Sequence, residues 1–241
     1  MLNVAAALLL ATAALWVWLP RSEPGQILHE GYSDCHPKFF HNLDSIPETE
    51  LVSLTASPVY NATQVQTMWP VSEFDAVSFC NVTYTYTHPG YGDRVNVQVY
   101  LPPPATWNGR FQGVGGGGFL AGMGDMVLLP AISHGYAAAG TDGGLLWTKY
   151  PPGDPSGWAT TAEGLLNRNQ LNVFGPLAIY DMTRIGQEVT KHYYRTQETG
   201  HKMRSYYHGC STGGRQGLMM AQRYPELYDG IIATAPATDY R

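Results

Sequence analysis

The chain has 241 residues, of which 44% are hydrophobic and 14% are charged, and its formal net charge is −5. A hydrophobic share this large beside so few charges excludes an intrinsically disordered chain and predicts a packed core. The acidic balance and the lack of a basic run argue against nucleic-acid binding. No series of long apolar runs fits a polytopic membrane protein, and the length suits one mixed α/β domain.

Residues 1–20 are almost entirely apolar, and the first basic residue, Arg21, follows them. This pattern predicts a cleaved secretory signal peptide, with an uncleaved membrane anchor or a buried core helix as the alternatives. The mature form is then expected to be extracellular and free of a membrane. Two sequons, at Asn61 and Asn81, are consistent with secretion and predict N-glycosylation there.

The three cysteines are Cys35, Cys80 and Cys210. An odd count in a secreted chain leaves one thiol without an internal partner. Cys35 and Cys80 flank one amino-terminal segment and could form a disulfide, which would leave Cys210 over.

A β-hairpin is the first regular structure that the sequence predicts. Residues 22–70 show no regular pattern and are expected to be irregular. The first strand of the hairpin is predicted over Val77–Tyr86, with a break in its alternation near Cys80. The second is predicted over Val95–Leu101, where apolar residues alternate strictly. The residues between them have the composition of a hairpin loop.

Strands and helices alternate after the hairpin. Strands are predicted at residues 110–114, 136–141, 205–209 and 230–235. Helices are predicted at 123–134, from Pro176 over about five turns, and at 213–223. This order predicts an α/β fold, with a mostly parallel sheet and flanking helices, entered by an antiparallel hairpin.

The candidate chemistry lies at the last strand–helix junction, in Gly209-Cys-Ser-Thr-Gly213. In such a G-x-S-x-G sequence, small residues let a serine, here Ser211, occupy a strained strand-to-helix turn, called the nucleophile elbow, that lifts its hydroxyl above the sheet. The amide after the serine then faces an oxyanion at the amino end of a helix. A glycine-rich turn with a capping serine is the alternative. Arg215 and Gln216 open the helix and are expected to pack or form hydrogen bonds rather than bind substrate.

This junction resembles the tannase and feruloyl esterase family, secreted α/β-hydrolases that act on esters of phenolic acids. The resemblance rests on Gly209–Gly217, Ala221–Pro225 and Tyr228–Ala237. Shorter matches lie upstream, at residues 80–83, 101–103, 107–111, 115–122 and 140–142. The resemblance therefore runs from about residue 30 to the end, and the cysteine directly before the serine is highly specific to the family.

The resemblance implies a role for each part of the junction. Ser211 would be the nucleophile, and Cys210 would form a disulfide with a cysteine beside the catalytic histidine. The amides of Thr212 and of the glycine loop, at Gly118 and Gly122, would hold the oxyanion. Feruloyl, galloyl or related esters, free or linked to polysaccharide, are the implied substrates. The family's calcium site lies in a lid after the elbow, so no cofactor or metal is expected in this chain.

The sequence departs from the family after the elbow. In an α/β-hydrolase the acid and then the histidine follow the serine. Here Asp229 and Asp239 follow Ser211, but no histidine does. His208 precedes the serine within its strand and is poorly placed to take the serine proton, and Asp229 is expected to serve a turn. We therefore expect residues 21–241 to be an incomplete catalytic domain, without the lid and the later strands, that is inactive alone; a non-catalytic product or pseudo-enzyme is the alternative.

A dinucleotide-binding site is a more remote alternative. Gly113–Gly118 matches G-x-G-x-x-G after a strand, and Asp142 lies 24 residues after Gly118. A run this rich in glycine matches almost any glycine pattern, however, and Phe119–Gly122 continues as a loop rather than opening a helix.

Overall fold

The computed structural model describes residues 32–43, 45–63, 74–146 and 148–238. The predicted signal peptide lies outside these residues. No helix within the described ranges is both long and apolar enough to cross a membrane.

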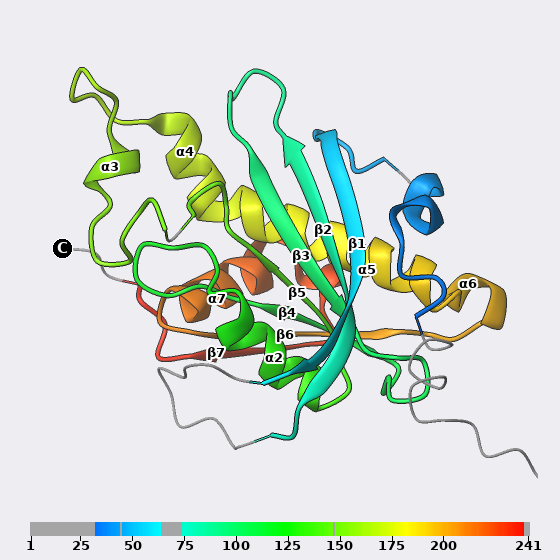
Figure 1. Cartoon of the computed structure of the whole chain (residues 1–241). Coiled ribbons are helices and arrows are strands. Elements are labelled where there is room, and N and C mark those ends of the chain that lie inside the picture. The colour runs from blue at the N-terminus through cyan, green and yellow to red at the C-terminus, as the bar shows by residue number, and fades with distance from the viewer. Residues whose placement is uncertain (1–31, 44, 64–73, 147, 239–241) are drawn as a thin grey trace, which may run out of the picture.

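Seven strands form one sheet in the order β1-β2-β3-β5-β4-β6-β7 (Figure 1). The strands are β1 (Glu50–Ala62), β2 (Val77–Thr87), β3 (Val95–Leu101), β4 (Arg110–Val114), β5 (Ala137–Thr141), β6 (Arg204–Cys210) and β7 (Gly230–Thr234). The pairs from β1 to β5 are antiparallel, and those from β5 through β4 and β6 to β7 are parallel. The sheet is therefore entered through the predicted hairpin and is parallel where the serine lies.

Strand β1 corrects the prediction that residues 22–70 are irregular. It pairs with β2 along one side only, so it forms an edge of the sheet. Most of its side chains are exposed or half-buried, and Pro58 lies within it, opposite Cys80. Proline is tolerated on an edge strand because one side of the strand has no ladder to interrupt. Without a buried face, β1 carries little of the alternation by which a strand is recognised.

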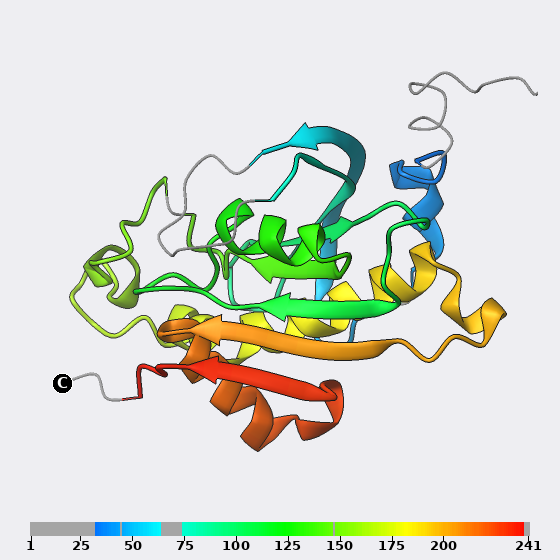
Figure 2. The same cartoon turned by 90° about the horizontal axis from the view of Figure 1, so that it is seen from below.

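Helices cover both faces of the sheet. Figure 2 shows α2 (Asp125–Ser133) on one side of the parallel strands and α7 (Thr212–Arg223) on the other, where α5 (Ala178–Tyr193) also packs. The prediction that a helix starts at Pro176 is wrong, because the helical run begins earlier: α4 (Arg168–Asn172) continues without a break through the π-helical turn η2 (Val173–Leu177), which contains Pro176, into α5. The shorter helices are η1 (Pro37–Asn42), α3 (Ser156–Ala159), α4 (Arg168–Asn172), α6 (Thr196–Thr199) and η3 (Pro225–Leu227).

Small residues in β5 let helices approach both faces closely. Ala138 packs with α2, whereas Ala137 and Ala139 belong to the larger core under α5. Alternation of side chains along a strand accounts for this division. Gly186 completes the contact, because a Cβ there would lie 2.6 Å from the Cβ of Ala139.

A disulfide joins Cys35 to Cys80 and ties the segment before β1 to β2. This is the pairing that the sequence allowed. Cys80 is completely buried. Cys210 is a free, half-buried thiol.

A buried charged cluster anchors the β2–β3 hairpin to α5. His88 lies 2.5 Å from Asp93 through Nδ1 and 2.9 Å from Asp181 through Nε2. The hydroxyl of Tyr86 donates to the same oxygen of Asp181 at 3.1 Å. Burial acts to lower the pKa of His88, but its hydrogen bonds to the two carboxylates outweigh burial and raise this pKa to about 9. The imidazole is therefore charged at neutral pH and donates from both nitrogens.

Candidate active site

Ser211 occupies the turn between β6, which ends at Cys210, and α7, which begins at Thr212. Its backbone angles are φ 58° and ψ −118°, a region that residues with a side chain rarely adopt. Three backbone bonds hold it there. Its amide donates to the carbonyl of Thr234 on β7 at 3.1 Å, and its carbonyl accepts from the amides of Arg215 and Ala237, each at 3.0 Å. The sharp turn of the G-x-S-x-G sequence is thus fixed by the strand and helix beside it.

Gly209 of the motif and two glycines beside it are required by close backbone packing. A Cβ on Gly209 would lie 2.4 Å from the carbonyl oxygen of Gly213. A Cβ on Gly214 would lie 2.4 Å from the carbonyl oxygen of Thr234, and one on Gly115 would lie 2.5 Å from the Cα of Gly213. Real Cβ atoms do not approach other atoms this closely, so any side chain at these positions would displace the elbow.

Gln216 joins the glycine loop to the elbow helix. Its Oε1 accepts from the amide of Gly116 at 3.0 Å, and its Nε2 donates to the carbonyl of Ala121 at 3.0 Å. The amide of Gly213 donates in turn to the carbonyl of Gly116 at 2.9 Å. Gln216 is completely buried, so these bonds are shielded from water. The prediction that this residue forms hydrogen bonds is confirmed.

The structure brings Thr212 and Gly118 together. The hydroxyl of Thr212 donates to the carbonyl of Gly118. In the described part of the chain, the amides of Gly117 and Gly118 donate no hydrogen bond. Gly122 packs instead against the end of β5, where a Cβ would lie 2.0 Å from the carbonyl oxygen of Thr141. An oxyanion site made by Thr212, Gly118 and Gly122 stays a prediction.

Tyr207, which no sequence motif marks, also holds the elbow in place. Its hydroxyl donates to the carbonyl of Gly213 at 3.0 Å and lies 3.3 Å from Oε1 of Gln216. Burial raises the pKa of Tyr207 well above its ordinary value, so the hydroxyl stays protonated and remains a donor. Only its alternation with exposed neighbours on β6 could have indicated this buried position.

Neither His208 nor Asp229 is hydrogen-bonded to Ser211. His208 is exposed on β6, and alternation places it on the face opposite Tyr207. Asp229 lies at the amino end of β7, where it accepts from Arg204 at 2.5 Å and from the amide of Ser205 at 2.8 Å. This is the turn role predicted for it. Asp239 lies outside the described residues, and none of the described histidines or carboxylates is hydrogen-bonded to Ser211.

The geometry does not fit a dinucleotide fingerprint. Asp142 accepts from the amide and side chain of Asn96 at 2.9 and 2.6 Å and from the amide of Gly144 at 2.8 Å. Burial raises the pKa of Asp142, and these bonds act against that rise. The helix after the glycine loop begins only at Asp125. A fingerprint needs a helix that opens at the loop and a carboxylate available to a ribose.

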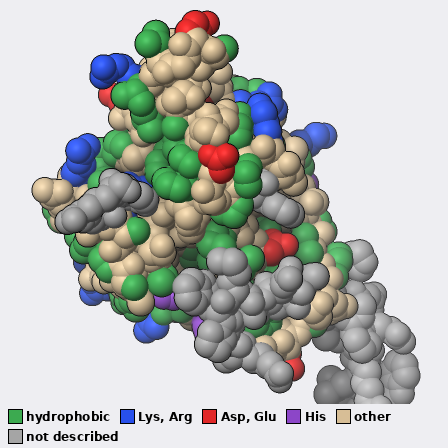
Figure 3. Space-filling model, turned by 90° about the vertical axis from the view of Figure 1, so that its left-hand side faces the viewer, with side chains coloured by type: hydrophobic (Ala, Val, Ile, Leu, Met, Phe, Trp, Pro, Cys, Tyr) green, Lys and Arg blue, Asp and Glu red, His purple; other side chains and the backbone are tan. Residues whose placement is uncertain are grey.

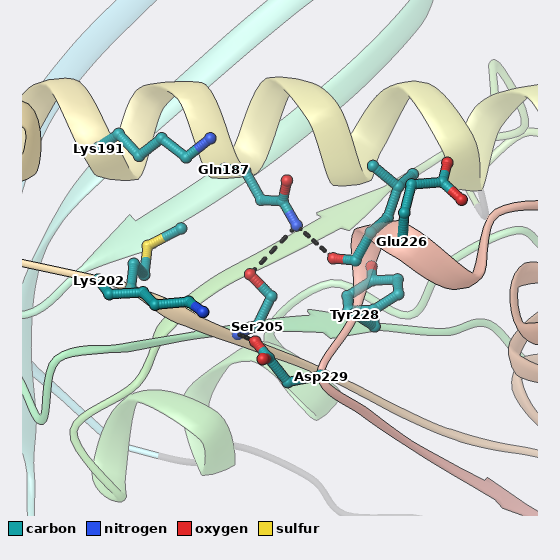
Figure 4. A pocket seen from close by; sticks show the side chains of 9 residues that line it. Gln187, Lys191, Lys202, Ser205, Glu226, Tyr228 and Asp229 are labelled. Atoms are coloured by element: carbon teal, nitrogen blue, oxygen red, sulfur yellow. Dashed lines mark hydrogen bonds between the residues drawn. The ribbon is translucent and has the colours of Figure 1, made fainter.

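The carboxyl and amino ends of the parallel strands present different surfaces. Seen from the carboxyl ends of the parallel strands, hydrophobic side chains gather in the middle of the face, and lysine and arginine lie toward its margin (Figure 3). At the amino ends, a pocket of about 300 Å³ is lined by Gln187, Lys191, Lys202, Ser205 and Asp229 among others (Figure 4). Since Ser205 lies near the amino end of β6 and Ser211 follows the carboxyl end of that strand, this pocket is distant from the elbow.

The asparagines of the two sequons differ in exposure. Asn61 is exposed on β1, whereas Asn81 is half-buried on β2, between Ser57 on β1 and Tyr100 on β3.

No three His, Cys, Asp or Glu side chains among the described residues are grouped as a metal site requires.

The sequence model of the tannase and feruloyl esterase family matches residues 80–241. This chain belongs to that family. It is 44% identical over 161 residues to a probable feruloyl esterase of Arthroderma benhamiae, and 37% identical over 187 residues to a tannase of Aspergillus oryzae. It spans 29% of the length of each of these relatives.

Solved structures bear out the α/β-hydrolase-type fold. A tannin acyl hydrolase from Aspergillus niger superposes with a TM-score of 0.73 at 30% sequence identity, over 84% of this chain and 37% of that chain. Feruloyl esterase B from Aspergillus oryzae superposes with a TM-score of 0.62 at 25% identity, over 86% of this chain and 37% of that chain. The family member described here therefore corresponds to a little over a third of those structures.

Proposed function

We propose that this chain carries the nucleophile and the oxyanion amides of a serine carboxylic ester hydrolase. The observation that carries the proposal is the position of Ser211, at φ 58° on the strand–helix turn, beside a glycine loop that Gln216 fixes to the same helix. A nucleophile held on such a turn and preorganised amides beside it are what acyl transfer requires of a protein. Membership of a family of tannases and feruloyl esterases supports the same reaction.

The chemistry follows from the elbow. The Ser211 hydroxyl oxygen attacks the ester carbonyl, and the carbonyl oxygen becomes an oxyanion. The amide of Thr212, at the positive end of the α7 dipole, and the amide of Gly118 stabilise that oxyanion. Collapse of the intermediate releases the alcohol and leaves an acyl-serine, which water hydrolyses to the acid. The serine proton needs a general base, and the 241 residues contain no histidine after His208.

The proposed substrates are phenolic esters, either small molecules or groups linked to polysaccharide, and the proposed location is extracellular. The relatives named tannase and feruloyl esterase support the substrate class. The Cys35–Cys80 disulfide is typical of an oxidising compartment, as is the predicted signal peptide. Asn61 is the better glycosylation candidate of the two sequons, because its side chain is exposed.

A fusion protein tests the role of Ser211. Residues up to 238 are joined to the remaining, carboxyl-terminal part of the Aspergillus niger tannin acyl hydrolase, and hydrolysis of methyl gallate and methyl ferulate is measured. Ser211→Ala should abolish turnover with the fold intact by circular dichroism. Ser205→Ala, at the start of the same strand, is the matched control and should retain turnover. Equal rates for Ser211→Ala and the unsubstituted fusion would refute the proposal.

A non-catalytic role for the 241-residue chain is the second candidate, favoured because none of the described histidines or carboxylates is hydrogen-bonded to Ser211. This chain should hydrolyse p-nitrophenyl acetate no faster than its own Ser211→Ala variant. Turnover well above that variant would show that the chain supplies its own base, and would remove this candidate.

A further inference from the structure

Arg215 carries a charge that nothing in the described part of the chain neutralises. It lies one helical turn after Ser211, and its guanidinium carbon is 5.0 Å from the centre of the Phe174 ring. The side chain as a whole is half-buried, but Nε and Nη2 are shielded from solvent, and neither has a hydrogen-bond partner among the described residues. A buried charged group without a partner is strongly disfavoured in a folded protein.

Two other arginines of the chain differ in this respect. Arg195 pairs with Asp34 at 2.7 Å and Arg204 pairs with Asp229 at 2.5 Å, although about half of each arginine side chain is exposed to water. Of these three arginines, Arg215 is thus the one that has two shielded nitrogens without an acceptor among the described residues. The ring of Phe174 offers a cation–π contact, but an aromatic face supplies no acceptor for the N–H groups at the edge of the guanidinium.

The two unpaired atoms define the shape of the missing acceptor. Nε and one terminal nitrogen form a planar fork whose parallel N–H groups match the two oxygens of a carboxylate. Trp158, which packs on the same Phe174 ring at a centroid distance of 4.9 Å, has a buried indole N–H that also has no partner in the described residues. Donors therefore collect around Phe174 without an acceptor among them.

We propose that the Nε–Nη2 edge of Arg215 is a binding site for a carboxylate, at the carboxyl end of the sheet beside the elbow helix. The carboxylate is either that of a free aromatic acid, whose ring would pack against the aromatic side chains of Phe174 and Trp158, or that of an acidic side chain of the polypeptide. The chemistry is the same in both cases. The proposal does not depend on esterase activity.

The test is thermal unfolding of the full 241-residue chain in the Ser211→Ala background, so that catalysis plays no part. Benzoate at about 10 mM is compared with benzamide, a neutral molecule of the same shape. If a free acid occupies the site, benzoate raises the melting temperature by about 3 °C, as expected for a dissociation constant near 1 mM, and benzamide does not. Arg215→Lys keeps the charge without the fork and should weaken benzoate binding about tenfold.

Arg215→Met separates the remaining outcomes. If an acidic side chain of the polypeptide fills the site, benzoate has no effect, and both Arg215→Met and Arg215→Lys lower the melting temperature without ligand. The proposal is overturned if benzoate has no effect and Arg215→Met leaves the melting temperature unchanged or raised, because the arginine would then have no partner to lose. Equal shifts with benzoate and benzamide would overturn it as well.

Discussion

Two regions of the molecule fasten a loop to a helix by opposite physical means. At the elbow, the neutral amide of Gln216 and a set of glycines hold the loop after β4 against α7. At the hairpin, the charged imidazole of His88 holds the β2–β3 loop against α5 through two carboxylates. The junction at Gln216 contains no titratable group, so its contribution to stability should not vary with pH, and its glycines leave no space for a side chain. The junction at His88 requires a protonated imidazole.

The largest expected effect is at the elbow glycines. Gly209→Ala would place a Cβ 2.4 Å from the carbonyl of Gly213, so the strand and the helix must move apart. We expect a loss of roughly 3 kcal/mol or more in the free energy of unfolding, measured by urea denaturation. Gly175→Ala is the matched control, since a Cβ there meets no atom within 4 Å, and it should be neutral or slightly stabilising. Similar losses at both positions would contradict the packing argument.

Replacing the central amide of the elbow should have the next largest effect. Gln216→Met keeps the volume and removes both bonds, which leaves the amide of Gly116 and the carbonyl of Ala121 buried without partners. The expected loss is about 2–4 kcal/mol in the free energy of unfolding, and the loss should not vary between pH 5 and 9. A loss below about 1 kcal/mol would mean that the loop is held by its glycines alone.

His88 should give the pH-dependent counterpart. Its pKa in the folded state is about 9, above the ordinary value of 6.5, so its stabilisation is complete below pH 6.5 and is lost as pH rises through 9. His88→Gln should cost on the order of 2 kcal/mol at pH 6 and much less at pH 9.5. Parallel stability curves for the two proteins over this range would contradict a charged His88.

Asp93 sets the acid limit of the same cluster. Burial acts to raise the pKa of Asp93, but its hydrogen bonds to His88 and Thr87 outweigh burial and lower this pKa below 3.8. Its stabilisation is therefore present above about pH 4 and is lost only as pH falls through the lowered value. Asp93→Asn should remove this acid dependence in equilibrium unfolding measured from pH 5 down to pH 2.

The smallest effect is expected at the amino ends of the parallel strands. Arg204 and Asp229 form an exposed ion pair that water and salt screen. Arg204→Ala should leave the thermal midpoint unchanged within error at physiological ionic strength. If Arg204→Ala clearly lowers the thermal midpoint even at high salt, the ion pair contributes to stability beyond what screening allows, which would contradict this expectation.

Local sequence patterns predicted strand β3 and the turn at Ser211 well. The alternation of Val95–Leu101 lies within one strand, and the glycines about Ser211 lie within one turn, so both can be recognised without knowledge of the fold. The bonds that give those elements their positions span the chain: Gly116 meets Gln216 100 residues away, and His88 meets Asp181 93 residues away. No local pattern encodes such a pairing. Strand β1 escaped prediction for a related reason, because an edge strand has little buried face to mark it.

The most direct test of the central claim is to find which residue a fluorophosphonate ester modifies in the fusion with the tannin acyl hydrolase. Tandem mass spectrometry of the tryptic peptide 205–215 distinguishes Ser211 from Ser205, the other serine of that peptide. The account predicts a single adduct on Ser211, and neither adduct nor turnover in Ser211→Ala. An adduct on Ser205 or elsewhere, or turnover that survives Ser211→Ala, would contradict it.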